Sequence, residues 1–179
     1  MPYRHDVKGG TVHNPDSRDA YLAPFNVQIN TFIEQHRGML AASLDGLTEG
    51  EARRRLVTSK TTLLGLVKHA AFVERVWFGE AVTGESRAEL GIPDTPDESF
   101  DLAETDTIES VLADYAVAVE QSRRAVAGMD GDTVLPGNRR GPLPLRWVQQ
   151  HMLRELAQHC GHADILRELV LAARSRTQE

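Results

Sequence analysis

The chain has 179 residues, of which 41% are hydrophobic and 26% charged, and its formal net charge is -6. This length is typical of one domain with its own core, and the composition excludes a wholly disordered, collagen-like or disulfide-scaffold protein. Nucleic-acid-binding proteins are more often basic, so the acidic balance disfavours nucleic acid as a partner.

Three further features bear on where the protein works. No stretch is apolar for long enough to cross a membrane, and the first residues lack the apolar core of a secretory signal. The one cysteine, Cys160, cannot form an internal disulfide. We therefore expect a cytoplasmic protein that does not act at a membrane.

The apolar residues recur three and four positions apart, which predicts helices. Residues 1–20 are polar and are expected to form an N-terminal arm, and residues 21–175 a single helical domain. Long helices are predicted in four segments: 24–44, 61–82, 107–127 and 145–173. A short helix could open at Thr48. No segment alternates in the manner of a strand, so the predicted fold class is all-α.

Four amphipathic helices of about 20 residues or more favour a four-helix bundle. Between the second and third helices, residues 84–106 are rich in acids and turn-forming residues and form a long connection. A 20-residue helix is about 30 Å long, and this connection can span it. We therefore expect a crossover that makes the second and third helices parallel. An up-down-up-down bundle with a decorated loop is the alternative.

Polar residues interrupt the apolar faces of two of these helices. His69 lies among apolar residues of the second helix, and Glu155 and His159 are one turn apart on the fourth. Side chains at positions i and i+4 can converge on one ion. Two imidazoles and one carboxylate suit Zn²⁺ with a fourth position left open, although Ni²⁺, Fe²⁺ or Mn²⁺ could use the same ligands.

Other interpretations of these residues remain open. A single inward histidine is more often a hydrogen-bonded core residue than a ligand, and Glu155 and His159 could form a simple polar pair. His36, on the apolar face of the first helix, is a rival ligand. His162 could be a ligand, a proton carrier or a substrate contact. His151 is two turns from His159 and is not expected to bind the same ion.

The remaining candidates are a thiol and three arginines. A Cys160/His159 nucleophile is disfavoured because adjacent helical residues point about 100° apart, so Cys160 is interpreted as a small apolar residue. Trp77 and Trp147 are expected in the core or in a pocket wall. Arg139, Arg140 and Arg146 could hold an anionic ligand near the pocket.

Two segments carry a resemblance to a known family. Residues 145–168 (LRWVQQHMLRELAQHCGHADILRE) resemble the last helix of the DinB/YfiT-like superfamily, and residues 63–78 (LLGLVKHAAFVERVWF) resemble its second helix. The resemblance implies an up-down-down-up four-helix bundle with one long crossover and a divalent metal held by three side chains. Carried onto this sequence, the ligands are His69, Glu155 and His159. Many members use three histidines, whereas a His/Glu/His set is similar to that of mycothiol-dependent maleylpyruvate isomerase and related thiol S-transferases.

These observations lead to one leading hypothesis and two alternatives. The leading hypothesis is a zinc- or nickel-dependent S-transferase or isomerase that uses mycothiol or another low-molecular-weight thiol on a small electrophile. His162 is the candidate catalytic proton carrier and Arg146 the candidate cofactor-binding residue. A metal-dependent hydrolase and a non-catalytic, metal-stabilised stress or binding protein are the alternatives. A homodimer is expected because members of the superfamily often pair.

Overall fold

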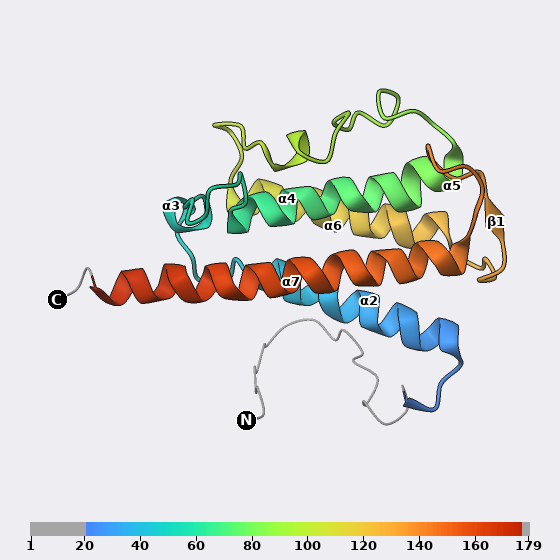
Figure 1. The fold of residues 1–179 in the computed structure, drawn as a ribbon, viewed down its shortest axis with the longest axis horizontal. Coiled ribbons are helices and arrows are strands. Elements are labelled where there is room, and N and C mark those ends of the chain that lie inside the picture. The colour runs from blue at the N-terminus through green and yellow to red at the C-terminus, as the bar shows by residue number, and fades with distance from the viewer. Residues whose placement is uncertain (1–20, 177–179) are drawn as a thin grey trace.

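The computed structural model describes residues 21–176, and the arm expected at 1–20 lies outside the described residues. The described chain is all-α, as expected, apart from one two-stranded ladder (Figure 1). Its helical elements, in chain order, are α2 (Phe25–Ala42), α3 (Glu49–Ala52), α4 (Leu63–Glu74), the π-helix η1 (Arg75–Glu80), α5 (Ala81–Thr83), the 3-10 helix η2 (Glu98–Phe100), α6 (Ile108–Ala125) and α7 (Leu145–Arg176).

Threonines fix the starts of three helices. The hydroxyl of Thr62 accepts a hydrogen bond from the Gly65 amide at the start of α4. Capping boxes start the other two, with Thr48 pairing with Glu51 at α3 and Thr107 with Ser110 at α6. Each cap satisfies amide groups that the first turn leaves without a helical partner. These boundaries are therefore set locally by the sequence.

The second long helix is not regular throughout. Residues of η1 form π-type turns between α4 and α5, a departure that the α-helical periodicity did not predict. The chain then leaves the helix at Gly84, whose φ of 76° is a left-handed conformation that favours glycine. The widened turns of η1 change which side chains of this helix face its neighbours.

Contacts between helices give their directions. Lys68 and Arg75 of α4 and η1 pair with Asp106 and Asp114, so the second long helix runs parallel to α6. The chain returns between them over residues 84–107, which lie across one side of the bundle (Figure 1).

The other two long helices form a second parallel pair. On α7, Gln149 donates to Asn30 of α2, and further along Arg167 donates to the carbonyl of Ser43. This pair runs opposite to α4 and α6 (Figure 1). The antiparallel packing of α4 against α7 brings the middle of the second long helix to the middle of the last one.

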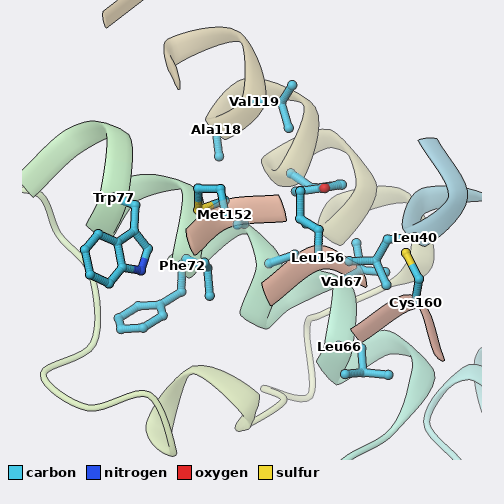
Figure 2. Packing of buried hydrophobic residues seen from close by; sticks show 14 of the residues in the cluster. Leu40, Leu66, Val67, Phe72, Trp77, Ala118, Val119, Met152, Leu156 and Cys160 are labelled. Carbon is cyan, nitrogen blue, oxygen red and sulfur yellow. The ribbon is translucent and has the colours of Figure 1, made fainter. Parts of the chain in front are cut away.

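The core lies between the four long helices. Figure 2 shows Met152 and Leu156 of α7 packed among residues of α4 and α6. The expected apolar face of α7 is buried along its whole length: Leu145, Val148, Met152, Leu156, Ala163, Leu166 and Val170. None of the helices in the described part of the chain combines the length and apolarity that a membrane crossing needs.

Two local features differ from what the sequence pattern predicts. The apolar spacing in the segment 24–44 predicts that Phe25 and Phe32 face the core, but they are 62% and 44% exposed, because the buried face of α2 is centred on Ile33 and these rings lie to one side of it. The expectation of no strand missed the antiparallel ladder of β1 (Val134–Leu135) and β2 (Leu143–Pro144). Strands of two residues are too short to show an alternating pattern.

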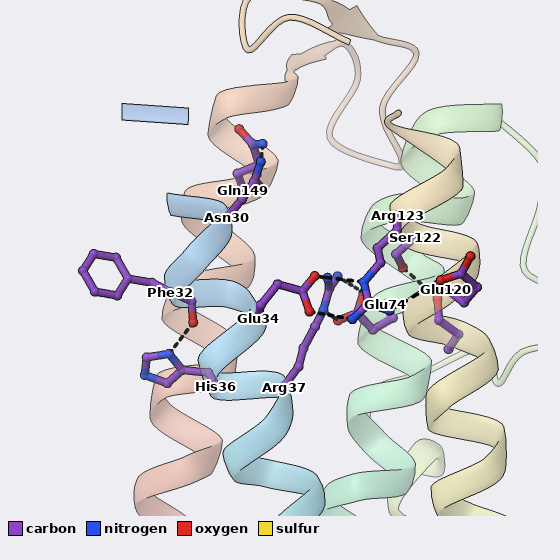
Figure 3. A network of polar contacts seen from close by, with 11 residues as sticks. Asn30, Phe32, Glu34, His36, Arg37, Glu74, Glu120, Ser122, Arg123 and Gln149 are labelled. Carbon is purple, nitrogen blue, oxygen red and sulfur yellow. Dashed lines mark hydrogen bonds and ion pairs between the residues drawn. The ribbon is translucent and has the colours of Figure 1, made fainter. Parts of the chain in front are cut away.

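A buried charge network joins three helices (Figure 3). The carboxylate of Glu74 on α4 is fully buried and accepts hydrogen bonds of 2.8 and 2.6 Å from Arg37 of α2. Arg37 also donates to Glu34, which in turn pairs with Arg123 of α6. Although burial by itself would lower it, the carboxylates of Glu74 and Glu34 raise the pKa of Arg37. Arg37 therefore keeps its positive charge inside the bundle.

Candidate metal centre

The antiparallel packing of α4 against α7 brings together three side chains with metal-ligand chemistry. His69 of α4 meets Glu155 and His159 of α7, and one ligand atom from each lies within 4.8 Å of the others. His69 is 5% exposed, and the side chains of His159 and Glu155 are 13% and 24% exposed. The cluster is therefore largely withdrawn from water, with its open side at Glu155.

His159 is the member that most needs a further partner. Both of its ring nitrogens are buried and neither has a hydrogen bond among the described residues. Its Nε2 lies 3.6 Å from Oε2 of Glu155, beyond hydrogen-bond distance. A buried polar atom without a partner costs free energy, and coordination of a cation would satisfy it. The donor set therefore fits a divalent metal.

The His69 ring is held by a serine from the crossover. Nδ1 of His69 lies 2.6 Å from Oγ of Ser99, and the same hydroxyl donates to the carbonyl of Pro96, also at 2.6 Å. Because the hydroxyl has one hydrogen and gives it to Pro96, it accepts the second bond from Nδ1–H. Nε2 therefore keeps its lone pair, as metal ligation requires.

The protonation state of His69 agrees with this arrangement. Burial lowers the pKa of His69 to about 4, and the neighbouring His159 adds to that effect. The imidazole is therefore neutral at physiological pH. A neutral ring can coordinate a cation without first losing a proton.

The crossover also covers this ring. The ring of Phe100, in η2, stacks on His69 with centroids 4.1 Å apart and an angle of 14° between the planes. The backbone of Phe100 comes so close to α4 that a Cβ on Gly65 would lie 3.4 Å from its carbonyl oxygen and 3.0 Å from Oγ1 of Thr62. Glycine at this position allows η2 to lie on the helix beside His69.

The carboxylate of Glu155 lies between two histidines. Its Oε1 is 3.5 Å from Nε2 of His151, one turn earlier on α7, while Oε2 faces His159. Arg154 donates to Nδ1 of His151 at 2.8 Å, which leaves the His151 Nε2–H directed toward Glu155. His159, with smaller contributions from His151 and Arg154, lowers the pKa of Glu155 although burial by itself would raise it. Glu155 is therefore ionised at neutral pH.

The structure does not bring the other candidates into this cluster. His36 is half-buried on α2, where its Nδ1 bonds to the carbonyl of Phe32. Arg146 is exposed in the first turn of α7 and pairs with Asp132. It precedes Glu155 by nine residues, or about 14 Å of helix.

His162 and Cys160 differ in their access to solvent. The exposed His162 ring is 5.9 Å from that of His159. Cys160 is 4% exposed, faces α2, and donates to the carbonyl of His36. Burial raises the pKa of the Cys160 thiol to about 11. Cys160 is therefore a packing residue in this fold.

Sequence reasoning missed the residues that the crossover contributes. Ser99 and Phe100 sit in a segment without helical periodicity, and nothing in their spacing links them to His69. The contact of His151 with Glu155 is different, because a separation of one turn places both side chains on one face of the predicted helix.

Comparison with known proteins gives one family. The family model described as mycothiol-S-transferase matches residues 28–172, which include most of α2 and α7 and everything between them. A search of the curated proteins finds no match. All three members of the His/Glu/His cluster lie within the matched residues.

Proposed function

Since the chain belongs to the mycothiol-S-transferase family, we propose that it is a divalent-metal-dependent enzyme that joins a thiol of the mycothiol type to a small electrophile. One observation carries the metal dependence. His69, Glu155 and His159 converge from two helices, and the two buried ring nitrogens of His159 have no hydrogen-bond partner among the described residues. Zinc is the metal that we expect first, because two imidazoles and a carboxylate suit it.

In this proposal His69 offers Nε2, His159 one ring nitrogen and Glu155 a carboxylate oxygen to the metal. When bound, a divalent cation supplies Lewis acidity that favours the deprotonated form of a thiol at neutral pH. The residues around the ligands prepare this site. Ser99 fixes the tautomer and the orientation of His69, and the Phe100 ring keeps water from one side of the imidazole.

The reaction needs one proton transfer and one new bond. The cosubstrate thiol gives up its proton, and a sulfur electron pair forms a bond to the electrophilic carbon. In a substitution, the leaving group departs with the electron pair of the bond that breaks. In an addition, the π electrons of the double bond take up a proton at the neighbouring carbon.

We assign the proton transfer to His162. Its ring is exposed and close to His159 on the open side of the cluster, where an imidazole can exchange protons with solvent. His162 is exposed and Glu155 is the most exposed of the three candidate ligands, so both cosubstrates would approach from the side of Glu155 and His162.

The first test measures metal content and turnover on the same preparations. Protein purified without chelators should contain about one equivalent of metal, and His69→Gln, Glu155→Gln and His159→Gln should each lose most of it. His36→Gln is the matched control on α2 and should keep the metal. Wild-type protein that contains no metal and takes up neither zinc nor nickel at neutral pH would overturn the metal dependence.

Activity separates the proposal from its two alternatives. Conjugation of mycothiol to a chloronitroaromatic compound should depend on both the thiol and the metal. Substrate cleavage that needs metal but no thiol would indicate a hydrolase. A chelator that lowers the melting temperature of a protein without turnover would indicate a structural metal.

A further inference from the structure

A second cluster lies next to the metal centre on α7. The guanidinium of Arg140 sits over the rings of Trp77 and Trp147, 5.7 and 5.9 Å from their centroids. His151 contacts the same two rings: it stacks on Trp147 with centroids 5.2 Å apart and its centroid lies 4.1 Å from that of Trp77. We call Arg140, Trp77, Trp147 and His151 the arginine–tryptophan cluster.

The π-helical turn explains how Trp77 reaches this cluster. Trp77 follows His69 by eight residues, and in a regular α-helix it would point about 80° away from it. The residues of η1 form wider turns, which reduce the rotation per residue. Trp77 therefore returns toward the face of the helix that meets α7, where its ring contacts Trp147 and His151.

Arg140 has no ion-pair partner within the described part of the chain. No carboxylate of residues 21–174 lies within ion-pair distance of its guanidinium, whereas nearby Arg146 is paired with Asp132. Two aromatic rings hold the cation by cation–π attraction. A guanidinium held in this way can still offer its N–H groups to a carboxylate in the bidentate manner that arginine favours.

The cluster continues directly into the metal centre. Trp147, His151, Glu155 and His159 follow one another at intervals of four residues on α7, and Nε2 of His151 is 3.5 Å from Oε1 of Glu155. Trp147 and Glu155 are eight residues apart, about 12 Å along the helix. A small molecule that reacts at the metal centre could therefore place an anionic group at Arg140.

We propose that the arginine–tryptophan cluster is the subsite for the electrophile, and that Arg140 binds a carboxylate on an aromatic or otherwise planar substrate. This inference rests on the proposed function, because the reacting carbon would lie at the metal centre. The thiol is not the source of the carboxylate, since a glycoside thiol of the mycothiol type carries no ionised group besides its sulfur. Trp147, 36% exposed, offers the ring surface against which a planar substrate would stack.

Binding can be tested without turnover, because the only two tryptophans of the chain are both in this cluster. Benzoate should change the tryptophan emission saturably, and uncharged benzamide should bind about tenfold more weakly or not at all. Arg140→Gln should weaken benzoate binding by about tenfold or more, while Arg139→Gln, which changes the adjacent arginine, should not. Arg140→Lys should keep part of the affinity, because lysine retains the positive charge but cannot donate two parallel N–H bonds to one carboxylate.

Three results of the binding experiment would overturn the subsite. They are the absence of saturable benzoate binding, equal affinity for benzoate and benzamide, and unchanged benzoate affinity in Arg140→Gln. None of them depends on catalysis, so they are distinguishable from a failure of the proposed transferase activity.

A kinetic comparison then connects the subsite to the reaction. In 4-chloro-3-nitrobenzoate and its methyl ester, the thiol sulfur replaces chloride, which leaves with the electron pair of the C–Cl bond, and the thiol proton passes to solvent. Arg140→Gln should raise KM for the acid by about tenfold and leave KM for the ester unchanged. Equal effects on both compounds would contradict a carboxylate contact. If neither compound reacts although benzoate binds through Arg140, the transferase proposal fails and the anion subsite stands.

Discussion

His69 donates from Nδ1 to the hydroxyl of Ser99, which donates in turn to the carbonyl of Pro96, and both hydrogen bonds are 2.6 Å long. The crossover between α5 and α6 thus orients a candidate metal ligand on α4. Loss of such an outer partner weakens metal binding by about 10- to 100-fold. We predict a weakening of this order for zinc in Ser99→Ala, measured by competition with a chromophoric chelator.

Two variants show whether the hydrogen bond is responsible. Ser99→Thr keeps the hydroxyl and should recover most of the zinc affinity. Ser110→Ala removes a hydroxyl whose hydrogen bonds are to Thr107 in the capping box of α6, and it should leave zinc affinity unchanged. Zinc affinity in Ser99→Ala equal to that of the wild type would contradict the role of Ser99.

The buried pair of Arg37 and Glu74 should be costly to break from one side. Arg37→Met leaves the Glu74 carboxylate without its partner in the core, and we expect the free energy of unfolding to fall by about 3–5 kcal/mol. The double variant Arg37→Met/Glu74→Leu should lose much less than the sum of the two single variants. Urea denaturation measures all three.

An exposed pair provides the matched control. Asp114 is half exposed where it pairs with Arg75, and Arg75→Met should cost about 1 kcal/mol or less. If the loss of unfolding free energy in the double variant equals the sum of the losses in the two single variants, Arg37 and Glu74 contribute independently. That result would contradict the network in Figure 3.

The stability of the metal-free protein should depend on pH through His69. Burial lowers the pKa of His69 from 6.5 to about 4, so between these values the unfolded chain binds a proton that the folded chain does not. The free energy of unfolding therefore decreases as pH falls from 6.5 to about 4, by up to roughly 3 kcal/mol at the lower pH.

His69→Phe isolates this contribution. Phenylalanine keeps the aromatic contact with Phe100 but does not titrate, so the variant should lose less stability than the wild type between pH 6.5 and 4. Urea titrations in the presence of a chelator measure the difference. Parallel losses in the two proteins would assign the pH dependence to other groups.

Cys160 should be unreactive in the folded protein. It is buried, and burial raises the pKa of its thiol to about 11, so very little thiolate exists at neutral pH. We predict that iodoacetamide labels it at least about 100-fold more slowly in the native protein than in urea. We also predict that Cys160→Ala retains transferase activity. Rapid labelling of Cys160 in the native protein, together with loss of activity in Cys160→Ala, would indicate that Cys160 is a nucleophile.

The all-α class and the positions of the long helices follow from the sequence because their determinants are local. Apolar periodicity marks the core face of α7, and threonine caps mark the starts of α4 and α6. The pairing of Glu155 with His159 is local in the same sense, since one turn of helix places both on one face. His69 could be selected as an inward histidine for the same reason.

The tertiary structure decided what stands around those residues. Parallel and antiparallel packing set His69 against His159, and the crossover supplied Ser99 and Phe100 from a segment without periodicity. The π turns of η1 turned Trp77 toward α7. The two-stranded ladder of β1 and β2 ends directly before the start of α7. Helical periodicity fixes which face a residue occupies, but contacts between distant segments depend on how the helices pack and where the connections lie, and no local pattern encodes these.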